Sequence, residues 1–103
     1  MVTEVRNNAA LERFELTVDG SPAGCIEYQD TGGERALVHT EIYSGFEGRG
    51  LAGALVRSAL DTSRAEGFEV LPMCAVVSHF VTTHPAYISL VPRRSREMFG
   101  LPQ

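Results

Sequence analysis

The spacing of apolar residues changes once along this chain, near residue 50, and this change constrains the fold more than any other feature. Before it, apolar and polar residues alternate, as in Phe14, Leu16 and Val18, which is the pattern of a half-buried strand. After it, apolar residues at positions 51, 52, 55, 56, 59 and 60 form the stripe of an amphipathic helix. Because 103 residues is the size of one domain with one core, the sequence predicts strands followed by a long helix in a single domain.

Turn residues divide the two halves into a defined order of elements. Asn7-Asn8 and Asp19-Gly20 predict turns between strands, and Gly67 predicts the end of the long helix. The predicted elements are strands at residues 2–6, 11–18, 24–30 and 35–43, a helix from 51 to 66, a strand at 68–75 and a short helix at 76–83. This order is β-β-β-β-α-β-α, and the strands on either side of the long helix are expected to be parallel.

Composition excludes several classes of protein. The net charge of −4 argues against a nucleic-acid partner that is recognised through its phosphates. The longest apolar run, residues 70–77, is too short to cross a membrane, and no apolar signal region opens the chain, so we expect a cytoplasmic protein without a membrane partner. Cys25 and Cys74 lack the spacing of metal ligands, which predicts free thiols and no metal.

Four glycines, at positions 45, 48, 50 and 53, lie between the last strand of the first half and the long helix. At a helix N-terminus the backbone N–H groups lack partners and the helix dipole is positive, so such a junction can bind an anion. The spacing fits neither the P-loop, which needs GK followed by Ser or Thr, nor the dinucleotide-binding fingerprint, which opens a βαβ unit. From these residues alone, an anion site and a plain glycine-rich turn both stay open.

The same segment resembles the pyrophosphate-binding motif of the GNAT acyltransferases, Q/R-x-x-G-x-G/A. On this chain the motif falls on Glu47-Gly48-Arg49-Gly50-Leu51-Ala52, where Gly50 and Ala52 match and Glu47 departs from the usual Gln or Arg. More narrowly, the chain is similar to the small single-domain YjdJ-type group of the GNAT superfamily. That resemblance is carried by His39-Thr40-Glu41, the glycine motif, Pro72-Met73-Cys74 and His84-Pro85-Ala86-Tyr87.

The resemblance implies a minimal GNAT fold of the mixed α/β (α+β) class. Its sheet would be mixed, mainly antiparallel, and splayed where the cofactor binds. The resemblance implies an N-acetyltransferase-like domain over residues 3–92. Residues 93–103 are left as a C-terminal tail, which we expect to fray.

The resemblance also implies that acetyl-CoA is the co-substrate, with no metal. The pyrophosphate would rest on backbone N–H groups of residues 48–53, and the pantetheine arm would pass between the strands that hold residues 40–42 and 73–74. The residues that the resemblance implies would bind acetyl-CoA are Thr40, Ile42, Glu47, Gly48, Arg49, Gly50, Leu51, Ala52, Gly53 and Met73. For Arg49, a solvated loop arginine is the alternative to a phosphate contact.

Three residues are candidates for the chemistry: Cys74, Glu41 and His39. The family layout puts Cys74 beside the thioester, where it could be inert packing, a nucleophile or an acid that protonates the leaving thiolate. His39 and Glu41 share one face of a strand and could take a proton from an amine, or could be ordinary polar residues. We expect His84 and Tyr87 to pack the terminal helix.

The family's activity would be transfer of an acetyl group from acetyl-CoA to an amine. Larger GNAT enzymes wall the acceptor site with helices between their first two strands, whereas residues 7–10 leave room only for a turn here. The resemblance therefore implies an N-acyltransferase for an exposed amine, such as one on a protein. The alternative is a catalytically weak acyl-CoA-binding or adaptor module.

Overall fold

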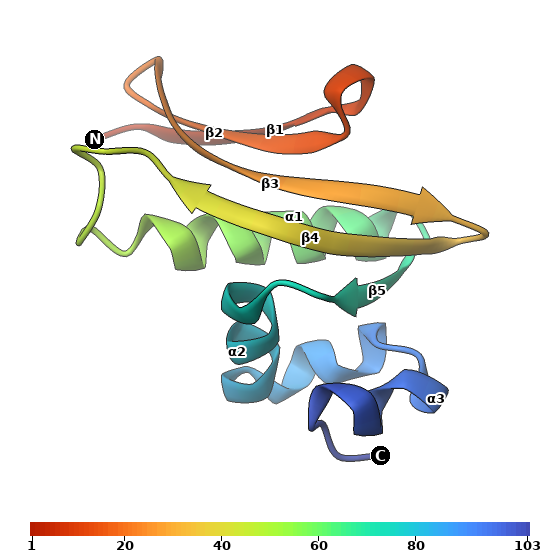
Figure 1. Ribbon diagram of the computed structural model, residues 1–103. Helices are drawn as coiled ribbons and strands as arrows, with labels where there is room; N and C mark the ends of the chain where they lie inside the picture. The colour runs from red at the N-terminus through yellow and green to blue at the C-terminus, as the bar shows by residue number, and fades with distance from the viewer.

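The five strands of the computed structural model, which describes residues 1–103, lie side by side in chain order (Figure 1). They are β1 (Thr3–Asn8), β2 (Arg13–Val18), β3 (Ser21–Thr31), β4 (Glu34–Ile42) and β5 (Glu69–Pro72). The first four pair antiparallel, and β5 pairs parallel with β4. The mixed, mainly antiparallel sheet predicted from the sequence is therefore confirmed.

The first turn lies later than predicted. Asn7 and Asn8 belong to β1, because they pair with Phe14 and Arg13 of β2, and the turn is the 3-10 helix η1 (Ala9–Leu11). The Asn8 side chain caps this turn by accepting a hydrogen bond from the N–H of Leu11 at 3.2 Å. β3 also begins three residues earlier than predicted, since Ser21 pairs with Val18 directly across the two-residue turn.

The long helix, α1 (Leu51–Ala65), crosses one face of the sheet and contacts all five strands (Figure 1). Its predicted stripe is buried, and Leu55, Val56 and Leu60 are fully covered. Gly67 ends the helix as predicted: its N–H bonds the carbonyl of Arg64, and the N–H of Phe68 bonds that of Ser63. These two bonds make a Schellman motif, which satisfies carbonyls that the last turn leaves unpaired.

The C-terminal segments continue past β5 and pack beside α1, while the other face of the sheet carries no helix (Figure 1). They are α2 (Ala75–Thr83), η2 (Pro85–Leu90), α3 (Arg93–Arg96) and η3 (Glu97–Phe99). The expectation that the tail frays is wrong, because Leu101 is buried in the core and Arg96 Nε donates to the Val91 carbonyl at 2.9 Å. The domain boundary at residue 92 stays a prediction.

Candidate functional site

β5 pairs with β4 along its whole length but ends five residues before β4 does, which leaves the far part of β4 with an open edge. Their pairing runs from Glu34 with Glu69 to Leu37 with Pro72, and the last bond joins the N–H of Cys74 to the Leu37 carbonyl at 3.0 Å. β4 then continues to Ile42 without a neighbour on that side. The parallel pairing predicted for these strands is confirmed, whereas their predicted splaying stays a prediction, because β5 ends at Pro72 while still paired with β4. The edge of β4 beyond that point has no neighbouring strand.

The glycine-rich loop joins the end of β4 to the N-terminus of α1. Gly48 and Gly50 have φ of +77° and +73°, a region that side chains rarely adopt, and their N–H groups, with that of Arg49, bond nothing in the protein. A Cβ at either glycine would meet no atom within 4 Å. A hollow of about 160 Å³ beside this loop is lined by Ile42, Phe46, Glu47, Gly48, Gly50, Leu51 and Ala52. The loop thus presents free backbone donors to open space.

The two charged side chains of the loop are turned back onto it. Glu47 Oε1 accepts a hydrogen bond from the N–H of Gly45 at 3.0 Å. The Arg49 guanidinium donates to the Gly45 carbonyl at 3.3 Å and lies 5.5 Å from the centre of the Phe46 ring. Glu47, the residue that departs from the family motif, therefore helps to fold the loop. Gly53 lies in the first turn of α1.

Cys74 precedes α2 and faces the inner side of β4. Its thiol donates to Thr40 Oγ1 at 3.2 Å, and the side chain is partly buried. Burial raises the pKa of Cys74, but the Thr40 hydroxyl and the backbone N–H groups of Val76 and Val77 lower it by more, so this pKa lies below the ordinary thiol value. Met73, next to Cys74 in the chain, is exposed.

His39 and Glu41 lie on the opposite, uncovered face of β4. Successive side chains of a strand alternate between its faces, and Thr40 between them points to Cys74. His39 Nε2 lies 3.4 Å from Glu41 Oε1, and both side chains are about half exposed. The structure therefore brings Cys74 together with Thr40, and His39 with Glu41, but does not bring the two pairs together on one face.

The segment from His84 to Tyr87, which follows α2, makes packing contacts. The Tyr87 hydroxyl donates to Asp61 on α1 at 2.8 Å and accepts from Arg57 at 3.4 Å. The His84 ring stacks on Phe80 with 3.9 Å between ring centres. These contacts match the expectation that both residues pack the terminal helix.

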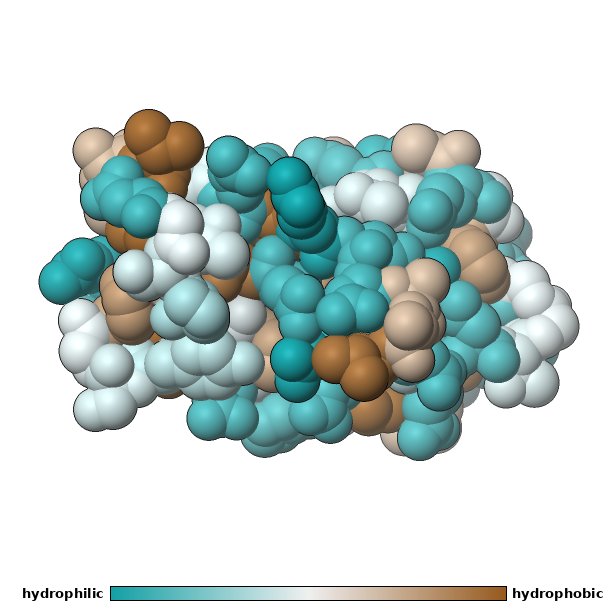
Figure 2. Space-filling view, turned by 90° about the horizontal axis from the view of Figure 1, so that it is seen from above, coloured by the Kyte–Doolittle hydropathy of each residue, from teal (hydrophilic) through white to brown (hydrophobic).

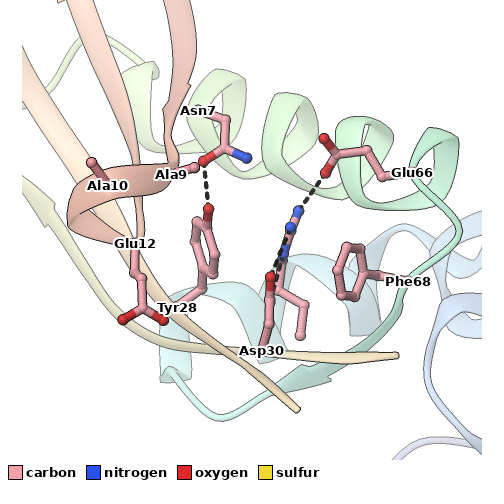
Figure 3. Close-up of a pocket in the computed structure, with 9 residues that line it drawn as sticks. Asn7, Ala9, Ala10, Glu12, Tyr28, Asp30, Glu66 and Phe68 are labelled. Carbon is pink, nitrogen blue, oxygen red and sulfur yellow. Dashed lines mark hydrogen bonds and ion pairs between the residues drawn. The ribbon is translucent and has the colours of Figure 1, made fainter. Parts of the chain in front are cut away.

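The largest hollow in the molecule, about 600 Å³, lies at the other end of α1 (Figure 3). Arg35 is one of the residues that line this hollow, and it is 3% exposed. Its guanidinium lies 4.4 Å from the centre of the Tyr28 ring and 4.1 Å from the centre of the Phe68 ring. Two hydrogen bonds of 2.9 and 3.0 Å join it to Asp30, and one of 2.8 Å joins it to Glu66. Sequence reasoning missed this cluster, although alternation puts Arg35 on the same inward face as Leu37.

No group of three His, Cys, Asp or Glu side chains is placed to hold a metal ion. None of the helices has both the length and the apolar character that crossing a bilayer requires.

Comparisons with known proteins agree with this architecture. The family model for GCN5-related N-acetyltransferases matches residues 13–90, so the chain belongs to this family, whose general activity is acyl-CoA-dependent acetyl transfer. Among solved structures, the fold is similar to the NMR structure of a GCN5-like candidate N-acetyltransferase from Staphylococcus aureus. The two share 15% identity and a TM-score of 0.66 over 86% of this chain and 87% of the other, a likeness of fold alone. A comparison with curated proteins finds no match.

Proposed function

We propose that this protein is an acetyl-CoA-dependent N-acyltransferase that acts on an exposed amine, and that it belongs to the YjdJ-type group. The observation that carries the proposal is that β5 ends at Pro72, which leaves the β4 edge without a neighbouring strand from residue 38 to 42. The amides of a pantetheine arm can pair with such an edge as an added strand does. This edge runs from Thr40, which Cys74 contacts, toward the glycine loop, whose N–H groups are free.

The pyrophosphate of CoA would bind at the glycine loop. Free N–H groups at Gly48, Arg49 and Gly50 adjoin the N-terminus of α1, where the helix dipole adds positive potential. These free N–H groups carry the assignment, and the volume of the neighbouring hollow does not enter it. We therefore assign the pyrophosphate to the loop and leave the adenosine outside it.

The reaction itself needs two proton movements. The amine attacks the thioester carbonyl carbon, a C–N bond forms, the C–S bond breaks, and CoA leaves as a thiolate that must gain a proton. Cys74, with its lowered pKa, contacts Thr40 on the open edge of β4, where we place the thioester, so it either protonates that thiolate or first accepts the acetyl group. An amine that crosses the uncovered face meets His39 and Glu41, which would accept its proton.

The acceptor is best explained as an amine on a large molecule. The connection between β1 and β2 is only four residues long, and no helix lies over the uncovered face to enclose a small substrate. An open site cannot select a small amine by burying its polar groups. A lysine side chain or an N-terminal amine on a protein surface would reach it without closure.

A direct test measures acetyl-CoA binding by calorimetry and CoA release with a panel of small amines, peptides and proteins. Binding together with amine-dependent CoA release supports the proposal. Binding without release from any acceptor would instead favour an acyl-CoA-binding or adaptor module. Absence of acetyl-CoA binding would refute both.

The role of Cys74 is tested separately by Cys74→Ala and Cys74→Ser, with mass spectrometry of the parent protein after incubation with acetyl-CoA. An acetyl adduct that is lost in both variants supports the covalent route. Unchanged turnover in Cys74→Ala would exclude any chemical role for this thiol.

A further inference from the structure

The outer edge of β1 is an unpaired strand edge with an unusual charge pattern. β1 is the first strand of the sheet and pairs only with β2. Val2 exchanges hydrogen bonds with Asp19, which follows β2. Because the backbone groups of successive strand residues point alternately to the two sides of the strand, those of Glu4 and Arg6 also point toward β2. The N–H and C=O groups of Thr3, Val5 and Asn7 therefore point outward and have no partner strand.

From this edge we propose that the protein forms a symmetric dimer in which the β1 strands of two copies pair antiparallel, centred on Val5. In this register Val5 faces Val5, and Thr3 faces Asn7, of the second copy. All of these residues have outward backbone groups, so each facing pair exchanges two hydrogen bonds. The two sheets join into one continuous sheet through a two-fold axis, as an isologous interface requires.

The side chains select this register. Val5 packs against the core on the α1 side, so Glu4 and Arg6 both project from the uncovered face, where they are 60% and 84% exposed. In the proposed register each Glu4 lies opposite Arg6 of the second copy, at a position where cross-strand side chains approach closely. A shift by two residues would oppose Glu4 to Glu4 or Arg6 to Arg6, and a shift by one would misalign the outward donors. Within one chain, the Glu4–Arg6 contact of 3.9 Å is at the limit of an ion pair.

Exposed apolar residues at the two ends of the edge also complement one another. Met1, Val2 and Leu11 are among the most exposed large apolar side chains, at 74%, 62% and 59%. The proposed register brings Met1 and Val2 of one copy toward the η1 turn, with its Leu11, of the other. Figure 2 looks at the molecule from the side on which β1 lies in Figure 1, and separate hydrophobic groups interrupt its mainly hydrophilic surface. Pairing would cover such groups at both ends of the strand.

This dimer is independent of the proposed activity. The β4 edge that we assign to CoA lies toward the opposite side of the sheet from β1, so it stays open in both copies of the dimer. Sedimentation velocity of the full chain from micromolar to millimolar concentration should show a reversible monomer–dimer equilibrium. A protein that stays monomeric throughout this range overturns the proposal.

Charge reversal tests the register. Glu4→Arg and Arg6→Glu each place like charges opposite one another in both pairs of the dimer, so each should weaken dimerisation about tenfold or more. An equimolar mixture of the two variants should recover the dimer, because the arginines of one copy then face the glutamates of the other. Native mass spectrometry of an isotope-labelled mixture distinguishes this heterodimer from either homodimer.

Matched controls are Glu97→Arg and Arg93→Glu, which make the same charge changes at exposed residues far from β1 in sequence. They should leave the dimer unchanged. Val5→Pro supplies a second test, since it removes an outward N–H that bonds nothing within the monomer. A dimer that survives both single reversals, or a mixture that fails to recover it, would place the interface elsewhere and overturn the proposal.

Discussion

The two ends of α1 differ in how their polar groups are satisfied. At the N-terminal end, the N–H groups of Gly48 and Gly50 bond nothing and face open space. At the C-terminal end, the Schellman bonds at Gly67 satisfy helix carbonyls, and the guanidinium of Arg35 is held by Asp30 and Glu66. About 22 Å of helix separates the two ends, as 15 residues at about 1.5 Å per residue imply.

Under the proposed function, the ligand site of this protein is not its largest hollow. The hollow at the C-terminal end is the larger one, about 600 Å³ against about 160 Å³, yet Arg35 there is already neutralised and hydrogen-bonded. The smaller hollow has unsatisfied donors and the positive end of the helix dipole. We infer that the C-terminal end of α1 serves stability and that its N-terminal end serves binding, and the two largest predicted effects test that division.

The largest expected effect is on stability, from Arg35→Met. Removing one partner of a buried ion pair leaves uncompensated charge, which typically costs 3–5 kcal/mol. Asp30 and Glu66 are 31% and 43% exposed, so we expect the low end of that range, about 3 kcal/mol, in the free energy of unfolding by denaturant. The affinity of the folded protein for acetyl-CoA should not change.

The control for this substitution is Arg94→Met. Arg94 pairs with Glu34 at the surface, where its side chain is 67% exposed, so its loss should change stability by less than about 0.5 kcal/mol. If Arg35→Met were no more destabilising than Arg94→Met, the ion cluster would have no structural role.

The second effect is on binding, from Gly50→Asp. A carboxylate would stand where we place the pyrophosphate, and a side chain at φ +73° adds strain of about 1 kcal/mol or more. We expect the affinity for acetyl-CoA, measured by calorimetry, to fall about tenfold or more, which is at least about 1.4 kcal/mol.

Gly20→Asp is the matched control, because Gly20 has φ +82° and an equally open surrounding in the turn between β2 and β3. It should lose similar stability and keep acetyl-CoA affinity. Equal binding losses in the two variants would show that strain or charge, and not the position of the loop, is responsible. Removing the pyrophosphate from the ligand should also cost more affinity than removing the adenine.

The smallest effect concerns the pH dependence of Cys74. Because its pKa is lowered in the folded state, the rate of alkylation should reach its midpoint at a lower pH than in the unfolded chain, whose thiol has a pKa of about 8.5. The lowered pKa adds stability above the unfolded thiol's pKa, and that stability is lost as pH falls through the folded value. Thr40→Val removes the main group that lowers this pKa, so it should raise the midpoint and destabilise the protein more at alkaline pH.

Cys25 is an internal control in this experiment, because it is buried and should react slowly at every pH in both proteins. Peptide mass spectrometry separates the two thiols. The same Cys74 midpoint with and without Thr40 would contradict the assignment of Thr40 as the group that lowers the pKa.

The sequence by itself determined the order of elements, the change from strands to helix and the parallel pair around α1. It also located the glycine loop and the end of α1 at Gly67. These features follow from short-range spacing: alternate residues share a strand face, residues three or four apart share a helix face, and glycine permits positive φ. Such patterns are readable without knowing which distant segments meet.

The tertiary structure alone decided the contacts between distant residues. The sequence could not place Cys74 against Thr40, 34 residues away, and away from His39 and Glu41, because that depends on where the pairing of β4 with β5 stops. Nor could it show that Leu101 joins the core, since a tail docks only where the assembled helices leave an apolar site for it. Register and packing are collective properties of the folded chain, so local patterns do not specify them.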